Sequence, residues 1–144
     1  GTAGFTAALA LLRMQENRQS AALGPLAVTG ATGGVGSLAV DIFSSAGYTV
    51  HAVSGKPEHA EYLKAIGAGE VLGRDALATT RAMESVKFGG GLDNVGGPML
   101  ASLLAQTRPY GNVASAGLAA SADLPTTVMP FIIRGVSLLG VASG

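Results

Sequence analysis

The stretch VTGATGGVGS, Val28–Ser37, decides the fold that we expect for this chain. Before it lies a short apolar run, Leu26–Thr29, and after it apolar residues recur at helical spacing over Ser37–Ala46. In doubly wound α/β folds, a glycine-rich turn between a strand and a helix holds the phosphates of a dinucleotide. The order strand, glycine turn, helix therefore predicts an anion-binding βα unit.

Three glycines of this turn have distinct expected roles. Gly30 permits the chain to leave the strand sharply, Gly33 lets the backbone approach a pyrophosphate, and Gly36 lets the helix pack close to the sheet. Free N–H groups at the start of the helix face the anion. A tight turn that binds nothing is the alternative, and the alternation of elements along the chain argues against it. The predicted turn site is Gly30, Thr32, Gly33, Gly34, Val35 and Gly36.

Strands and helices alternate along the rest of the chain. Apolar runs predict strands over Leu26–Thr29, Tyr48–Val53, Glu70–Leu72, Leu92–Val95, Asn112–Ser115 and Val136–Val141. Helical spacing predicts helices over Thr2–Ser20, Ser37–Ala46, Glu58–Ile66, Pro98–Gln106 and Val128–Ile133. This pattern predicts one domain, residues 1–144, with an α/β fold: a doubly wound, parallel, six-stranded sheet of the Rossmann type in three α/β/α layers. Phe88–Gly91 is expected to form a flexible turn.

The composition excludes several other classes of protein. Of 144 residues, 48% are hydrophobic and 12% charged, which is too apolar for a disordered chain. The formal net charge is zero, so we expect no nucleic-acid or anionic-membrane surface, and no apolar run approaches the roughly 18 residues of a membrane span. No cysteine is present, which excludes disulfides and thiolate zinc sites and fits a cytoplasmic protein. His51 and His59 lie in different elements, so no metal site is expected.

The end of the second expected strand indicates which dinucleotide the turn would bind. NAD enzymes usually carry Asp or Glu there, about 20 residues beyond the turn, to accept hydrogen bonds from the ribose 2′-OH. This chain has Ser54-Gly55-Lys56 instead. A hydroxyl and an ammonium accommodate a 2′-phosphate that a carboxylate would repel, and Arg74 would reach the same phosphate from the next loop. The sequence therefore favours NADPH.

The glycine spacing alone fits two families of reductase. Gly30-x-x-Gly33-x-x-Gly36 suits zinc-independent medium-chain reductases, whereas Thr29-Gly30-x-x-x-Gly34-x-Gly36 fits short-chain dehydrogenases. A short-chain dehydrogenase needs a tyrosine followed four residues later by a lysine, whose ammonium lowers the pKa of the phenol. That short-chain catalytic pair is absent, because the positions four residues after the three tyrosines are Ala52, Ile66 and Ala114.

Four segments carry a closer family resemblance. They are GTAGFTAA (Gly1–Ala8), VTGATGGVGS (Val28–Ser37), AVSGKPEHAEYLKAIGA (Ala52–Ala68) and LPTTVMPFIIRGVSLLGVAS (Leu124–Ser143). On these segments the chain resembles, from end to end, the zinc-independent, quinone-oxidoreductase-like medium-chain reductases, and most closely their acrylyl-CoA reductase branch.

The resemblance implies an NADPH-dependent enzyme that does not use catalytic zinc. Its reaction would be reduction of an activated carbon–carbon double bond, as in acrylyl-CoA to propionyl-CoA, or reduction of a quinone. In that family a β-rich domain in two parts flanks the nucleotide-binding domain and shares the small-molecule substrate with it, and neither part lies in this sequence. Two departures from the family pattern are Lys56, where relatives commonly have Arg, and Ala142, where they often have Asp.

The resemblance also implies a set of cofactor-binding residues. Gly33–Val35 would contact the pyrophosphate, and Ser54, Lys56 and Arg74 the 2′-phosphate. The expected contacts of the inner ribose are Asn94, Val95 and Gly96, and the residues expected beside the nicotinamide are Ala116, Gly117, Leu118, Val141 and Ser143. No catalytic residue is expected within this chain.

Other features have simpler interpretations or alternatives. Tyr62 and Leu63 are expected to pack their helix onto the sheet, and Asp93 to stabilise the turn after the fourth strand. Arg134 would reach a CoA phosphate or a partner subunit, or lie at a solvated helix end. The apolar last strand would pair with a second copy across a two-fold axis. The rival function is a non-catalytic NADP sensor of the atypical short-chain type, because its TGATGxxG turn looks similar.

Overall fold

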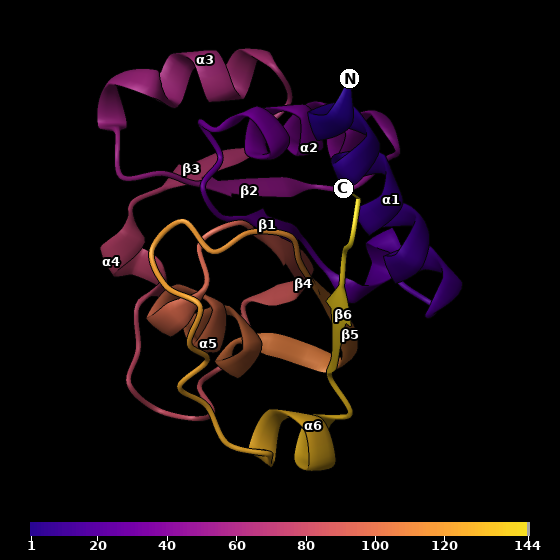
Figure 1. Ribbon diagram of the computed structural model, residues 1–144, viewed down its shortest axis with the longest axis vertical. Coiled ribbons are helices and arrows are strands. Elements are labelled where there is room, and N and C mark those ends of the chain that lie inside the picture. The colour runs from indigo at the N-terminus through magenta and orange to yellow at the C-terminus, as the bar shows by residue number, and fades with distance from the viewer. Residues whose placement is uncertain (144) are drawn as a thin grey trace.

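The structure, a computed structural model, describes residues 1–143 and contains six strands flanked by helices (Figure 1). The strands are β1 (Leu26–Val28), β2 (Val50–Val53), β3 (Glu70–Leu72), β4 (Phe88–Asp93), β5 (Thr107–Ser115) and β6 (Ser137–Gly140). The helices are α1 (Thr2–Glu16), α2 (Gly34–Ser45), α3 (Ala60–Ala65), α4 (Arg74–Leu77), α5 (Gly97–Ala105) and α6 (Met129–Arg134), with short 3-10 turns at Ala21–Leu23 and Pro57–His59. Within the described residues, no helix is long and apolar enough to cross a bilayer.

The six strands form one parallel sheet in the order β3-β2-β1-β4-β5-β6. Each connection therefore crosses one face of the sheet, and the direction of winding reverses between β1 and β4. This topology confirms the predicted doubly wound Rossmann fold. In such sheets the carboxyl ends of the strands on either side of the reversal leave a crevice for a ligand.

Two hydrophobic cores lie on opposite faces of the sheet. Helices α1, α2 and α3 cover one face, where Met14, Phe43 and Leu63 are fully buried. Helices α4, α5 and α6 cover the other face, where Leu77 and Leu103 are buried (Figure 1). Each strand therefore contacts apolar side chains on both faces, which explains the near-continuous apolar runs in the sequence.

The prediction of a flexible turn at Phe88–Gly91 was wrong, because these residues begin β4, the buried strand beside β1. Glycine is required there by close packing. A Cβ at Gly91 would lie 2.5 Å from the carbonyl oxygen of Ala27 on β1, and one at Gly90 would lie 2.9 Å from Oε1 of buried Gln19. Three consecutive glycines resemble a loop in sequence, but here they let a strand approach its neighbours.

Several predicted boundaries also differ from the structure. Helix α1 ends at Glu16 rather than near Ser20, because Arg18 adopts the left-handed conformation with φ of 68°. Strand β5 begins five residues earlier than expected, at Thr107, and the four-residue helix α4 was not predicted. Tyr62 was expected to pack against the sheet, yet 51% of it is exposed, and only its neighbour Leu63 is buried.

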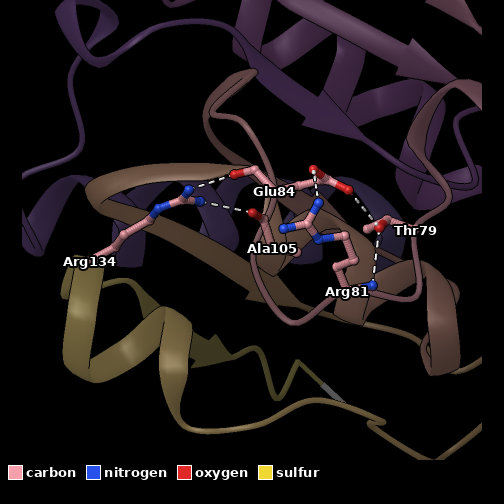
Figure 2. Close-up of polar contacts among 5 residues, drawn as sticks. All are labelled: Thr79, Arg81, Glu84, Ala105 and Arg134. Atoms are coloured by element: carbon pink, nitrogen blue, oxygen red, sulfur yellow. Dashed lines mark hydrogen bonds and ion pairs between the residues drawn. The ribbon is translucent and has the colours of Figure 1, made fainter.

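Arg134 is neither at a solvated helix end nor free to reach a ligand, as Figure 2 shows. Its guanidinium donates hydrogen bonds to the carbonyl oxygens of Ala105, at 2.8 Å, and Glu84, at 2.5 Å. The carboxylate of Glu84 in turn accepts a hydrogen bond from Thr79 Oγ1 at 3.1 Å and lies 3.9 Å from Arg81 (Figure 2). Arg134 thus ties α6 to the loop between α4 and β4 and to the end of α5.

Candidate functional site

A cleft of about 800 Å³ lies at the carboxyl ends of the strands, at the point between β1 and β4 where the winding of the chain reverses. This volume lies within the range of small-molecule and cofactor sites, roughly 300–1,000 Å³. Its walls come from the glycine turn after β1 and from the loops after β3, β4 and β5. The predicted site residues that line it are Gly30, Thr32, Gly33, Gly34, Val35, Gly36, Arg74, Asn94, Val95, Gly96, Ala116, Gly117 and Leu118.

The glycine turn has a backbone shape that other residues would disturb. Gly30 has φ of +58°, which allows the sharp exit from β1 that the sequence predicts. A Cβ at Gly36 would overlap the carbonyl oxygen of Gly30, so α2 begins directly against the turn. Gly33 is different, because its nearest neighbour beyond the adjacent residues would be the Gly30 oxygen at 3.4 Å. Gly33 therefore leaves space on the cleft side of the turn.

The amino end of α2 faces this cleft through its unpaired backbone. Gly33 is the N-cap residue and offers no side chain, so it cannot accept hydrogen bonds from the first N–H groups of the helix. Within the described residues, no protein acceptor pairs with the N–H groups of Gly34 and Val35. A 12-residue helix with free N–H groups and the positive end of its dipole at a cleft suits a phosphate.

Asp93, at the end of β4, connects the two loops that form the middle of the cleft. Its Oδ1 accepts a hydrogen bond from Thr29 Oγ1 at 2.7 Å, and its Oδ2 accepts from the N–H groups of Gly96 at 2.7 Å and Val95 at 3.2 Å. Thr29 Oγ1 also accepts from the N–H of Asn94 at 3.0 Å, and Asn94 Nδ2 donates to Thr29 O at 2.9 Å. As predicted, Asp93 stabilises the turn after the fourth strand.

Burial raises the pKa of the Asp93 carboxyl above its ordinary value, although the hydrogen bonds from Thr29, Gly96 and Val95 oppose the rise. The side chain is completely inaccessible to solvent, so its charged form loses hydration that the hydrogen bonds only partly replace. This carboxyl holds its proton to higher pH in the folded state than in the unfolded chain. It therefore contributes stability that is present below the unfolded pKa and lost as pH rises through the folded pKa.

Polar and basic side chains gather at the β2 end of the site. Ser54, Lys56 and Arg74 border a small cavity of about 40 Å³ that adjoins the main cleft at Gly30 and Thr32. The Ser54 hydroxyl oxygen accepts a hydrogen bond from the backbone N–H of Lys56 at 3.0 Å. This leaves the hydroxyl proton of Ser54 available for an anion. The structure thus brings together the three residues predicted to contact a 2′-phosphate.

The opposite end of the site is formed by the loops after β5 and β6. Ala116, Gly117 and Leu118 line the main cleft and also a neighbouring cavity of about 410 Å³, which Val141 shares. Ser143 lines neither cavity, and its hydroxyl pairs with Thr6 Oγ1 of α1. The structure therefore separates Ser143 from the other predicted site residues.

Four residues that line the main cleft were not predicted from the sequence. Pro98 and Met99 lie in the first turn of α5, and Ala119 and Ala120 follow β5. The residues Gly96-Gly97-Pro98 were a sequence signal for the first pair, since paired glycines indicate a turn and proline favours the first turn of a helix. In the structure both glycines have positive φ. The two alanines carry no chemical signal, and only the path of the loop places them in the cleft.

The residues described here do not form a metal site. No group of three or more His, Cys, Asp or Glu side chains that could hold a metal ion occurs among residues 1–143. His51 lies in β2 with Nε2 4.0 Å from Glu70 on β3, and His59 ends a separate 3-10 turn. These side chains do not fit a zinc ion, so no step below involves one.

The parallel sheet, the glycine turn and the cleft at the reversal define this chain as a Rossmann-like α/β domain. Residues 34–144 match the model of a family described as zinc-binding dehydrogenases. The chain belongs to this family.

Several known proteins resemble the chain over 99% of its length. One is the acrylyl-CoA reductase AcuI of Ruegeria pomeroyi, which is 48% identical. The crystal structure of the yhdH oxidoreductase from Salmonella enterica in complex with NADP is 48% identical, with a TM-score of 0.96. The Bacillus subtilis protein yhfP, a putative quinone oxidoreductase whose structure has NAD bound, is 48% identical with a TM-score of 0.97. The chain spans 44% of the length of each of these relatives.

Asp93→Asn should destabilise the fold by about 1–3 kcal/mol, because the amide nitrogen cannot accept one of the hydrogen bonds that the carboxyl accepts. The loss should be larger at about pH 4 than at pH 7, because only wild type gains stability when Asp93 binds its proton. Urea unfolding of both proteins at the two pH values measures this. Asp41→Asn, on the exposed face of α2, is the control and should change stability by less than about 0.5 kcal/mol. A loss that grows from pH 4 to pH 7 contradicts the assignment.

Proposed function

We propose that this chain is the NADPH-binding part of a reductase that acts on an activated carbon–carbon double bond or on a quinone. The observation that carries the proposal is the combination of two features in one cleft. The free N–H groups at the start of α2 suit a pyrophosphate, and Ser54, Lys56 and Arg74 border the adjoining cavity where an NAD enzyme would carry an acid.

The proposed roles of the chain follow from the order of the walls along the cleft. Gly33–Val35 bind the pyrophosphate, and the Thr29–Asp93 pair holds the loop of Asn94, Val95 and Gly96 in position for the inner ribose. Ala116–Leu118 and Val141 form a wall for the nicotinamide, which supplies a hydride when bound. These residues orient the cofactor and shield one face of it from water, and none of them is placed to act as a general acid.

Similarity to proteins with bound cofactors supports dinucleotide binding, and two of three such structures hold the phosphorylated form. The Salmonella relative is described with NADP, an E. coli relative with NADPH and the Bacillus relative with NAD, at 48–49% identity. The residues of this chain also support the preference for NADPH. A hydroxyl, an ammonium and a guanidinium at the 2′ position favour a phosphate over a hydroxyl group.

The proposed substrate is an enoyl thioester like acrylyl-CoA, or a quinone, shared with a second domain outside this sequence. The names of the Ruegeria and Bacillus relatives support these two substrate classes. The alternative, a non-catalytic NADP sensor, has less support, because relatives named as a reductase and as an oxidoreductase match 99% of the chain. A cytoplasmic location stays a prediction.

The domain should bind NADPH roughly 10- to 150-fold more tightly than NADH, which corresponds to about 1.5–3 kcal/mol from contacts to the 2′-phosphate. Lys56→Ala should remove most of this preference and leave NADH binding nearly unchanged. Lys64→Ala, an exposed lysine on α3, is the matched control and should keep the preference. Calorimetric titration with both cofactors measures it. Equal affinities of wild type for NADPH and NADH would rule out the proposed preference.

The 144-residue chain alone should bind NADPH without oxidising it at an appreciable rate in the presence of acrylyl-CoA or a quinone. Hydride transfer needs the acceptor held against the nicotinamide, and such positioning is worth roughly 7–11 kcal/mol of the barrier. This chain supplies a wall only on the cofactor side. Cofactor oxidation, followed with each acceptor, should appear when the flanking sequence of the longer protein is present. Fast turnover by the chain alone would contradict this division of roles.

A second copy of the chain is the proposed protein partner. Strand β6 lies at one edge of the sheet, and the adjacent helix α6 exposes Ile132 and Ile133, at 75% and 59%. An open edge beside exposed apolar side chains favours pairing across a two-fold axis. Light scattering should give about twice the 14.2 kDa of one chain. A mass of one chain at high concentration would refute the pairing.

A further inference from the structure

The guanidinium of Arg74 lies directly against the backbone of Gly55. A Cβ at Gly55 would lie 2.8 Å from Cζ, 2.9 Å from Nε and 3.1 Å from one terminal nitrogen of Arg74. Arg74 is the first residue of α4, and Gly55 lies in the turn after β2 between Ser54 and Lys56. The absence of a side chain at position 55 therefore allows Arg74 to lie across this turn.

Backbone conformation does not explain the glycine at this position. Gly55 is not among the glycines with positive φ, so an alanine could adopt the same conformation without strain. The atoms that a Cβ would meet all belong to the far end of a flexible side chain. Alanine would therefore displace Arg74 and leave the backbone of the turn in place. The glycine at position 55 therefore serves to leave space for the guanidinium of Arg74.

The charges at this turn are not neutralised by the protein. Among residues 1–143, no carboxylate oxygen lies within ion-pair distance, 4.0 Å, of Lys56 or Arg74. Both side chains border the small cavity that adjoins the main cleft, together with the Ser54 hydroxyl. Two unpaired cations and a free hydroxyl proton around one cavity suit a phosphate monoester. A seated guanidinium loses less conformational entropy on binding it than a mobile one does.

We propose that Gly55 is a positioning residue for phosphate recognition: it seats Arg74 beside Ser54 and Lys56, and this arrangement selects the 2′-phosphate of an adenosine nucleotide. The proposal rests on the proposed function, because it concerns the adenosine end of the same cleft. Gly55 contributes by having no side chain, and it acts on the ligand only through Arg74.

The test compares two probes, adenosine 2′,5′-bisphosphate and 5′-AMP, which differ only in the 2′-phosphate. Calorimetry on the 144-residue chain gives the affinity ratio of the two probes for wild type, Gly55→Ala, Arg74→Ala and the double variant. Gly73→Ala is the matched control, because a Cβ at Gly73 meets nothing within 4 Å and its φ is −76°. Thermal melting of each variant checks that it is folded.

Gly55→Ala should weaken binding of the bisphosphate about tenfold and leave 5′-AMP unchanged. Arg74→Ala should do the same, and the double variant should lose no more than Arg74→Ala alone, because both changes remove one contact. Gly73→Ala should keep the wild-type ratio.

Three results would overturn the proposal. If the affinity ratio of Gly55→Ala stays at the wild-type value, with or without equal weakening of both probes, the glycine does not act through the 2′-phosphate. Losses that multiply in the double variant mean that Gly55 and Arg74 act independently. If wild type binds both probes equally, the NADPH preference is wrong as well. If wild type prefers the bisphosphate and Gly55→Ala keeps that preference, only the role of Gly55 is wrong.

Discussion

The hydrogen bond between Thr29 and Asp93 is the contact on which the middle of the cleft depends. It joins the ends of β1 and β4, the two strands between which the winding of the sheet reverses. Opposite winding carries the chain away from this point in both directions, which leaves a crevice for a ligand between the two loops. The carboxylate holds them by accepting from a side chain of one strand and two N–H groups of its own loop. The buried carboxyl of Asp93 loses its hydration, and its hydrogen bonds fix the positions of the two loops relative to each other.

Close backbone packing is the second constraint, and glycines satisfy it on both sides of the reversal. Gly36 allows α2 to start against the carbonyl of Gly30, and Gly117 lies where a Cβ would come 2.6 Å from the carbonyl oxygen of Asn94. Gly91 does the same between β4 and β1. These three glycines thus have a common role, which is to allow the approach of backbones at the centre of the sheet and around its carboxyl edge.

Much of the candidate site was predictable because parallel strands end at a common edge. Once the strands were placed, the residues following β1, β2, β4 and β5 had to lie near one another, and the structure confirms that they do. Arg74 follows the same rule after β3. Ser143 does not, because the chain beyond β6 turns toward α1, where its hydroxyl meets Thr6. Met99 was missed because an apolar residue in a helix has the same pattern whether it faces the core or a cleft.

The sequence by itself determined the alternation of strands and helices, the position of the glycine turn and the absence of an acid after β2. Each of these depends on local spacing or on the identity of one residue. The tertiary structure alone decided that Phe88–Gly91 is a central strand, that Arg134 is tied to the carbonyls of Ala105 and Glu84, and that Arg74 lies on Gly55. The physical reason is that a glycine shows in sequence only that a side chain is absent. Whether the space is left for a turn, a neighbouring strand or a guanidinium depends on which distant segment packs against it.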